Sequence, residues 1–215
     1  MTKKTPKSSA DANQHNASAQ DSLGLERLVF FSDAVFAIAA TLLALDIRLP
    51  AGQEAMDNIQ LLTALLGIWH KYLAYWISFL VIGFFWTSHH RKFRFIKRYD
   101  RGLFMLNLLF LMVIAFVPFP TSVISEYGNR TATVFYALTM VLAGLLLTAI
   151  WWHAARHNRL LEPPLDPGDR RQQFVALFLT LAVFGLSIGL AFVDDDLAKF
   201  SWLLILPVSL AVKGP

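Results

Sequence analysis

The chain has no cysteine among its 215 residues, and only 16% of its residues are charged. The absence of cysteine excludes disulfides, thiol chemistry and cysteine-ligated metal sites. An average soluble domain carries about 25% charged residues, so this chain is poor in charge, and 56% of its residues are hydrophobic. No HExxH string occurs, which removes a common metalloprotease motif. The composition therefore indicates a polytopic membrane protein, and we do not expect it to be an enzyme.

Apolar segments alternate with charged loops along the chain. A spanning helix needs about 20 predominantly apolar residues. On that criterion we expect an all-α fold with six transmembrane helices, at Leu28–Leu49, Tyr72–Ser88, Leu103–Ile124, Ala132–Trp152, Phe174–Val193 and Phe200–Val212. The segment Ala55–Ile68 is too short for a separate span and is interpreted as an extracellular amphipathic piece. Residues 1–22 are polar and lack aromatics, which predicts a disordered cytoplasmic tail ahead of a transmembrane domain at residues 23–215.

The basic residues concentrate in two of the loops. Residues 89–101 contain six Lys or Arg against the single acid Asp100, and the linker after the fourth span adds four arginines. The opposite loops are richer in acids. Because basic loops remain in the cytoplasm, both termini are predicted to lie inside. This topology accounts for the net charge of +4 without a nucleic-acid partner. It also puts Trp86, Trp151 and Trp152 at the inner membrane boundary, and Trp69 and Trp202 at the outer one.

The first span carries polar residues that a lipid-facing helix would exclude: Ser32, Asp33, Thr41 and Asp46. Ionisable groups inside a span cost about 2.5–3.5 kcal/mol each on insertion scales, so they usually face protein or water. At about 100° per residue, one stripe of the helix consists of Phe31, Ala34, Ile38, Thr41, Leu42 and Leu45. Such a stripe most often contacts lipid or core, and the alternative is that it borders a permeation path.

Asp33 requires a partner in this setting. Small residues (Ala37, Ala40 and Ala44) share its side of the helix and permit close packing, so we expect this side to be buried against protein. Arg27 lies six residues away, beyond the usual reach within one helix. The polar candidates at the same depth on other spans are Trp86, His89, His90 and Asn107. A polar clamp between helices is a more ordinary role for Asp33 than contact with an ion.

The string Arg27-x-x-x-Phe31-Ser32-Asp33-Ala34 closely resembles the first-helix signature of the transmembrane protein 175 family. The resemblance continues through Trp86-x-x-His89-x-Arg91-x-Phe93, through Asp100 and Asn107, and through the run IAFVPFP. It covers about residues 24–125, and the later spans match mainly in hydropathy.

The resemblance implies a cation channel with modest selectivity for potassium over sodium, without the TVGYG filter, a string that does not occur here. It further implies a homotetramer in a prokaryotic cell membrane, with the first helix of each subunit around the pore. Ile38, Leu42 and Leu45 would form the hydrophobic constriction, and Thr41 would be the selectivity hydroxyl. Arg27, Ser32 and Asp33 would belong to an interhelical polar network. No cofactor is implied beyond the permeant potassium ion.

Asp46 is a candidate for the outer mouth, where its charge would concentrate cations. Two other function classes remain open. A proton-coupled secondary transporter would use Asp33 with His89 or His90 as a proton relay. An intramembrane enzyme is less well supported, because adjacent histidines point to different sides of a helix and make a poor metal pair.

Overall fold

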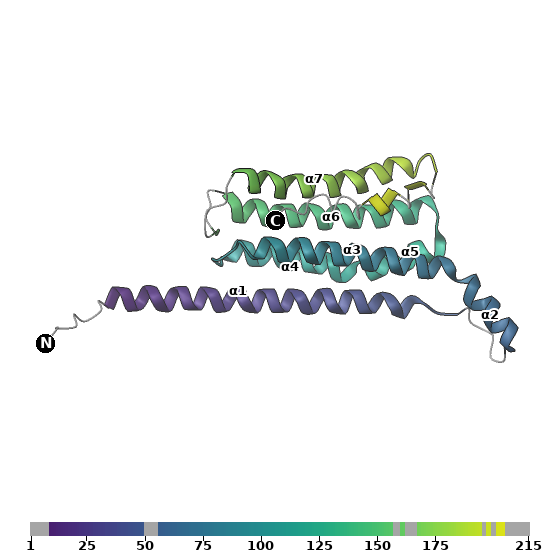
Figure 1. Cartoon of the computed structure of the whole chain (residues 1–215), viewed down its shortest axis with the longest axis horizontal. Helices are drawn as coiled ribbons and strands as arrows, with labels where there is room; N and C mark the ends of the chain where they lie inside the picture. Colours follow the sequence, from purple (N-terminus) through teal and green to yellow (C-terminus); the bar gives the residue numbers. More distant parts are fainter. Residues whose placement is uncertain are drawn as a thin grey trace.

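The computed structural model describes residues 9–49, 56–156, 160–161, 167–194, 197–198 and 201–204. Over these residues the regular secondary structure is helical (Figure 1), so the all-α prediction is confirmed. In chain order the elements are α1 (Ser9–Leu42), the 3-10 helix η1 (Leu43–Asp46), α2 (Asn58–Gly67), α3 (Trp69–Phe93), α4 (Arg101–Phe116), α5 (Pro118–Tyr127), α6 (Arg130–Ala155), α7 (Pro167–Leu190) and the 3-10 helix η3 (Trp202–Leu204).

Three helical stretches in the described ranges are long and apolar enough to cross a membrane, namely Ser22–Asp46, Arg101–Tyr127 and Arg130–Ala155. Helices α2 and α3 make a fourth when they are taken as one span bent by 46°. Helix α7 overlaps the fifth predicted span. The sixth, Phe200–Val212, lies outside the described residues except at Ser201–Leu204, so the count of six stays a prediction.

Helix α1 begins earlier than the sequence suggested. We expected disorder through Ser22, but the helix is continuous from Ser9. Four of the fourteen residues at positions 9–22 are alanine, the best helix former. They also extend a helix that already exists, so no unfavourable nucleus is needed. In Figure 1 this part of α1 projects beyond the ends of the other helices.

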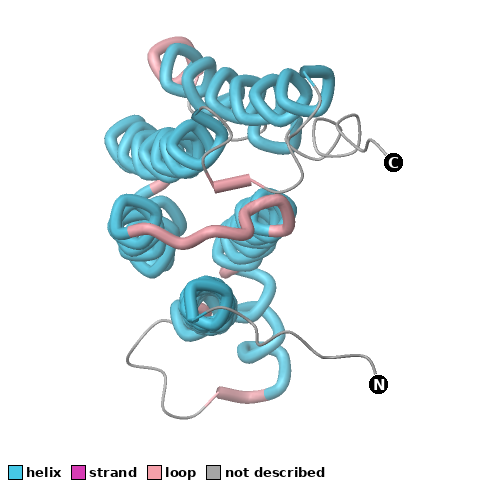
Figure 2. Tube along the Cα trace, turned by 90° about the vertical axis from the view of Figure 1, so that its left-hand side faces the viewer, coloured by secondary structure: helices cyan, strands magenta, loops and turns pink. Residues whose placement is uncertain are grey.

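The helices stack in layers, with α1 at one edge of the bundle and α7 at the other (Figures 1 and 2). Helix α1 packs against α3 and α4, α4 and α5 pack against α6, and α6 packs against α7. One side of α1 is therefore covered within the chain and its opposite side is not.

Local sequence signals set several of the helix ends. Asp57 and Gln60 form a reciprocal capping box at the start of α2. Asp100 caps α4 by accepting a hydrogen bond from the Leu103 amide. Pro118 breaks the α4–α5 span, because proline cannot donate to the preceding turn. Gly128 ends α5 in the left-handed conformation with φ 59°, which favours glycine.

Two of the tryptophans that the sequence places at the membrane boundaries are buried between helices. Trp151 and Trp202 are buried in the protein core. The Trp151 ring lies 6.0 Å from the Nζ atom of Lys92, which is itself buried at the end of α3, and Trp202 stacks on Tyr136. Both rings therefore pack between helices. The belt pattern could not distinguish this from contact with lipid headgroups, because both environments suit an amphipathic ring.

Candidate functional site

Helix α1 has one buried face and one exposed face. The buried face comprises Leu28, Ser32, Phe36, Ala39 and Leu43, which recur every three or four residues and face α3 and α4. All six members of the predicted stripe are exposed, and Ile38 and Leu45 keep 58% and 59% of their surface. A large apolar surface left open on one chain indicates contact with lipid or with another subunit.

The stripe changes pitch at its end. Helix α1 tightens into the 3-10 helix η1 at Leu43. In a 3-10 helix the residues three apart lie one above the other. Leu45 follows three residues after Leu42, the last residue of α1, and both side chains are exposed, so the apolar surface continues from Ile38 toward the end of the span.

Thr41 is the one hydroxyl on this stripe. Its Oγ1 donates a hydrogen bond to the Ile38 carbonyl at 2.8 Å and remains exposed. The hydroxyl proton is therefore used within the helix, while the oxygen lone pairs remain available on the exposed face. This orientation makes Thr41 an acceptor toward whatever lies beyond the stripe.

A buried chain of hydrogen bonds joins α3, α4 and α1 directly behind the stripe. The Nε2 atom of His89 lies 2.8 Å from Oδ1 of Asn107, whose Nδ2 donates to the Oγ of Ser32 at 2.9 Å. Ser32 in turn donates to the Leu28 carbonyl at 2.7 Å. The side chains of all three polar residues are fully buried. Each donor faces an acceptor, so the hydrogen bonds run in one direction, from the imidazole of His89 to the backbone of α1.

The surroundings of His89 favour a neutral ring. Its imidazole stacks on Phe93 at 4.1 Å between ring centroids and on Phe110 at 5.7 Å. Nε2 is assigned as the donor because it faces the Asn107 carbonyl oxygen. In the described part of the chain, the buried Nδ1 has no hydrogen-bond partner. A bare lone pair tolerates that environment better than an N–H would, so the structure gives His89 a single proton, on Nε2.

Asp33 finds its partner on α3. The Trp86 indole Nε1 donates to Oδ1 of Asp33 at 2.9 Å, and both side chains are partly exposed. His90 lies against the Trp86 ring with the centroids 5.7 Å apart. Arg27 is exposed and makes no hydrogen bond or ion pair with the described residues. Seven residues were predicted for the network. Five of them form two separate sets of hydrogen bonds, one through His89, Asn107 and Ser32 and one between Trp86 and Asp33. His90 makes a ring contact, and Arg27 lies outside both sets.

The alanines near Asp33 do not bury it within the chain. Ala37 and Ala44 are exposed, and the closely packed alanine of α1 is Ala39. The alanine row and the buried row are adjacent on the helix, and the packing against α3 and α4 decides which of them is covered within the chain.

Replacing Trp86 by Phe tests the clamp. The ring is kept and only the N–H donor is lost, so we expect the free energy of unfolding in detergent to fall by about 1 kcal/mol, because the pair is partly solvated. In a double-mutant cycle with Asp33→Ala, the two losses should not add. Trp76→Phe is the matched control, since Trp76 is an exposed tryptophan on the same helix. Fully additive losses would show that the bond contributes nothing.

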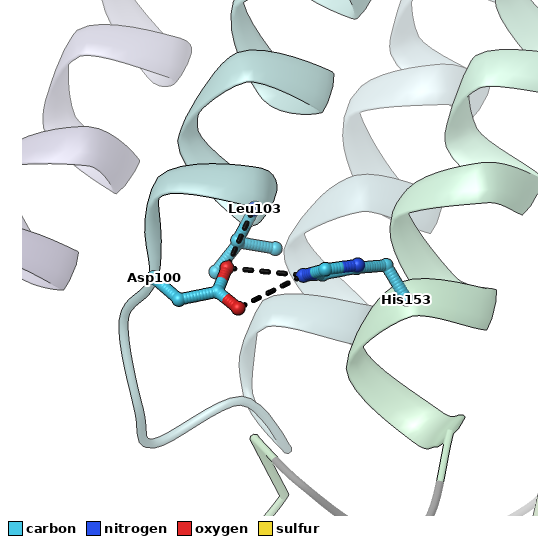
Figure 3. Close-up of polar contacts among 3 residues, drawn as sticks. All are labelled: Asp100, Leu103 and His153. Carbon is cyan, nitrogen blue, oxygen red and sulfur yellow. Dashed lines mark hydrogen bonds and ion pairs between the residues drawn. The ribbon is translucent and has the colours of Figure 1, made fainter.

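A second polar link lies at the basic end of the bundle, and sequence reasoning missed it (Figure 3). His153 of α6 places Nε2 at 3.0 Å from both carboxyl oxygens of Asp100, the residue that caps α4. Gly102 permits the approach, because a Cβ there would lie 2.7 Å from the His153 ring. The only available cue was a capping acid before an apolar run, which does not identify a distant histidine.

The other end of α1 carries charges of both signs. Asp46 is half-buried in η1. Two residues later, Arg48 donates through Nε to the Leu45 carbonyl, and Lys71 of α3 donates to the Arg48 carbonyl. Asp46 would therefore have to attract cations beside two basic side chains. Its place at the outer mouth stays a prediction.

The spanning helices and the open apolar face of α1, supported by a buried polar chain, define a membrane protein with the layout of an ion channel. No group of three or more His, Asp or Glu side chains that could hold a metal ion occurs within the described ranges. The family model described as the endosomal/lysosomal potassium channel TMEM175 matches residues 27–118. This chain belongs to the TMEM175 family of ion channels.

Individual relatives agree with this assignment. The chain is 43% identical to a potassium channel of Streptomyces collinus over 80% of this chain and 84% of the relative. It superposes with a TM-score of 0.77 on the crystal structure of a lysosomal potassium-selective channel TMEM175 homolog from Chamaesiphon minutus, with 30% identity over 89% of this chain and 99% of that one. It is also 31% identical to the human endosomal/lysosomal proton channel TMEM175, over 83% of this chain and 38% of the human protein.

Proposed function

We propose that this chain is a potassium-selective channel, modestly selective over sodium, of a prokaryotic cell membrane, with both termini in the cytoplasm. Four copies would surround one pore, with potassium as the permeant ion and no cofactor. The observation that carries the proposal is the exposed stripe on α1, which a single chain leaves without a partner. One stripe cannot enclose a path, so several copies related by rotational symmetry are required.

Ile38, Leu42 and Leu45 would form the constriction. An ion between rings of aliphatic side chains loses its water without gaining ligands, and a narrow ring expels water altogether. Opening would require the rings to separate until the ion keeps its hydration. The buried hydrogen-bond chain supports this role, because it fixes the opposite face of α1 to α3 and α4.

Thr41 would supply the side-chain oxygen of the stripe. Its proton is held by the Ile38 carbonyl, so four symmetry-related oxygens would face the pore as acceptors. Oxygen ligands of this kind replace part of the hydration shell of a monovalent cation.

The proposal is tested by flux in liposomes that contain the purified full-length chain. A potassium gradient should drive flux that does not saturate as a carrier would, with sodium passing less readily. Proton flux is measured in the same vesicles, since the vertebrate relatives are named proton channels. Saturable potassium flux with a fixed proton ratio would overturn the proposal in favour of the transporter. The geometry gives that alternative little support, because Asp33 binds an indole N–H, which cannot relay protons.

Thr41→Val tests the selectivity role. The variant keeps the shape of the side chain and removes the oxygen, so we expect the potassium-to-sodium permeability ratio to fall toward one while assembly persists. The measurement is the reversal potential under bi-ionic conditions. Thr87→Val is the matched control, because Thr87 is an exposed threonine on α3 that donates to its own helix at the Gly83 carbonyl. A wild-type reversal potential in Thr41→Val would place selectivity elsewhere.

A further inference from the structure

Exposed basic side chains lie at one end of the bundle. The loop that joins α3 to α4 and the end of α6 are at this same end (Figure 1). Their exposed lysine and arginine residues are here called the basic surface: Arg94, Lys97, Arg98, Arg101 and Arg156. Within the described ranges, none of these side chains makes a hydrogen bond or an ion pair. The charges of the basic surface are therefore open to a partner outside the chain.

Backbone hydrogen bonds hold the α3–α4 loop beside the end of α6. The amides of Lys97 and Arg98 donate to the Leu160 carbonyl, at 2.9 and 3.3 Å. The Leu160 amide in turn donates to the carbonyl of Ala154, in the last turn of α6, at 3.4 Å. Because Arg156 follows two residues later, the fold brings its charge to those of the loop.

Two further contacts hold the same loop. Ile96 is fully buried and forms an isolated antiparallel bridge with Leu161. Tyr99 packs beside α1, since a Cβ at Gly24 would lie 3.5 Å from its ring. A loop that is held at several points presents its charged side chains on a defined surface, so binding costs less conformational entropy.

Acidic residues do not cancel the charge of this loop. Asp100 is the only acid among residues 89–101. Its carboxyl group accepts from the Leu103 amide and pairs with His153. Glu26 of α1 is exposed and forms no ion pair with the residues that the structure describes. The basic surface therefore suits an anionic partner.

An exposed tryptophan lies close to the basic surface on α6. Trp152 is 61% exposed and precedes Arg156 by four residues, so the two lie on the same side of the helix. Tryptophan is enriched where lipid headgroups meet the hydrocarbon. Clusters of about four to eight Lys or Arg directly beyond a spanning helix are typical of sites for anionic lipids. This combination favours a lipid headgroup over a soluble anion.

We propose that the basic surface binds the phosphate groups of anionic phospholipids in the adjoining leaflet. Arginine donates two parallel hydrogen bonds to a phosphate, and lysine binds it as a point charge. Basic loops also orient a chain in the membrane, but orientation requires no preference for one lipid over another. A local preference for an anionic lipid is therefore the property that distinguishes a binding surface from charge that only faces water.

The test uses a single fluorescent reporter, which the absence of cysteine makes possible. Met105 is exposed on α4, one turn beyond Arg101. The full-length Met105→Cys chain is labelled with a maleimide fluorophore and reconstituted in phosphatidylcholine liposomes. Quenching by a small fraction of phosphatidylglycerol that carries a doxyl group near its headgroup is compared with quenching by the same fraction of doxyl-labelled phosphatidylcholine. Conduction is not measured, so the outcome is independent of the proposed channel activity.

We expect phosphatidylglycerol to quench the reporter more strongly than phosphatidylcholine. Lys97→Gln/Arg98→Gln should lower this preference by about fivefold or more, since one basic residue near an anionic surface contributes about that factor. Glutamine keeps the amides that donate to Leu160, so the loop should stay in place. Lys97→Arg/Arg98→Lys retains both charges and should retain the preference. The matched control, Arg48→Gln/Lys71→Gln, removes the same charges from side chains that already donate to backbone carbonyls, and should leave the preference unchanged.

A second pair of substitutions lies outside the loop backbone. Arg101→Gln/Arg156→Gln, at two helix ends, should lower the preference as the loop pair does. Equal quenching by the two lipids when the basic surface is intact would overturn the proposal. A preference that survives both pairs of glutamine substitutions, or that the control variant reduces equally, would do the same.

Discussion

Replacing Ile38 by Asn is expected to raise resting potassium flux by about tenfold or more and to weaken discrimination against sodium. Four carboxamides in place of four aliphatic groups would give water hydrogen-bond partners in the narrowest layer, so the layer would stay wet. Removal of about 1.4 kcal/mol from the barrier already corresponds to a tenfold gain in rate. Because Ile38 is exposed on the single chain, the substitution should leave the fold of each subunit intact.

The measurement is ion flux from liposomes that contain equal amounts of assembled protein. Ile59→Asn makes the same chemical change at an exposed isoleucine of α2, away from the stripe, and should leave flux unchanged. Wild-type flux in a well-assembled Ile38→Asn variant would remove Ile38 from the pore.

Replacing Asn107 by Leu should have the largest effect on folding. The change is close in volume, but it leaves the buried Nε2–H of His89 without an acceptor and removes the donor to Ser32. An unsatisfied buried donor costs about 1–3 kcal/mol. Since the chain of bonds joins three helices, we also expect fewer assembled complexes in mild detergent.

Stability is measured by chemical unfolding in detergent and assembly by size-exclusion chromatography with light scattering. Thr139→Val is the control, because Thr139 is a buried threonine whose hydroxyl bonds only to the Phe135 carbonyl of its own helix. An Asn107→Leu variant no less stable than this control would mean that the chain of hydrogen bonds does not hold α1 in place.

Periodicity was enough to define the apolar stripe of α1, but not its buried face. The stripe from Phe31 to Leu45 was obtained from 100° steps alone, and the structure leaves all six of its residues exposed. Depth in the membrane limits the candidate partners of Asp33, because helices that cross one membrane bring residues of equal depth together. Equal depth does not distinguish Trp86, His89, His90 and Asn107 as partners, because the distinction depends on how α3 and α4 are rotated about their axes.

The features that sequence reasoning missed arise from contacts between distant segments. His153 meets Asp100 because α6 passes beside the start of α4 and because Gly102 leaves space for the ring. A pocket lined by Tyr136 and Trp202 forms only where α3, α5, α6 and η3 converge. The continuation of α1 back to Ser9 has a different cause: polar composition predicts disorder, but a segment that contains several alanines readily extends an anchored helix.

The two faces of α1 also imply a genetic distinction. A substitution on the covered face, such as at Ser32, impairs the subunit before it meets another, so in a cell with a second, normal gene copy it should behave as recessive. A substitution on the open face, such as at Ile38, leaves a subunit that folds and joins mixed rings. Under the proposed assembly, one altered subunit then affects a pore shared with normal ones. Such alleles should be dominant.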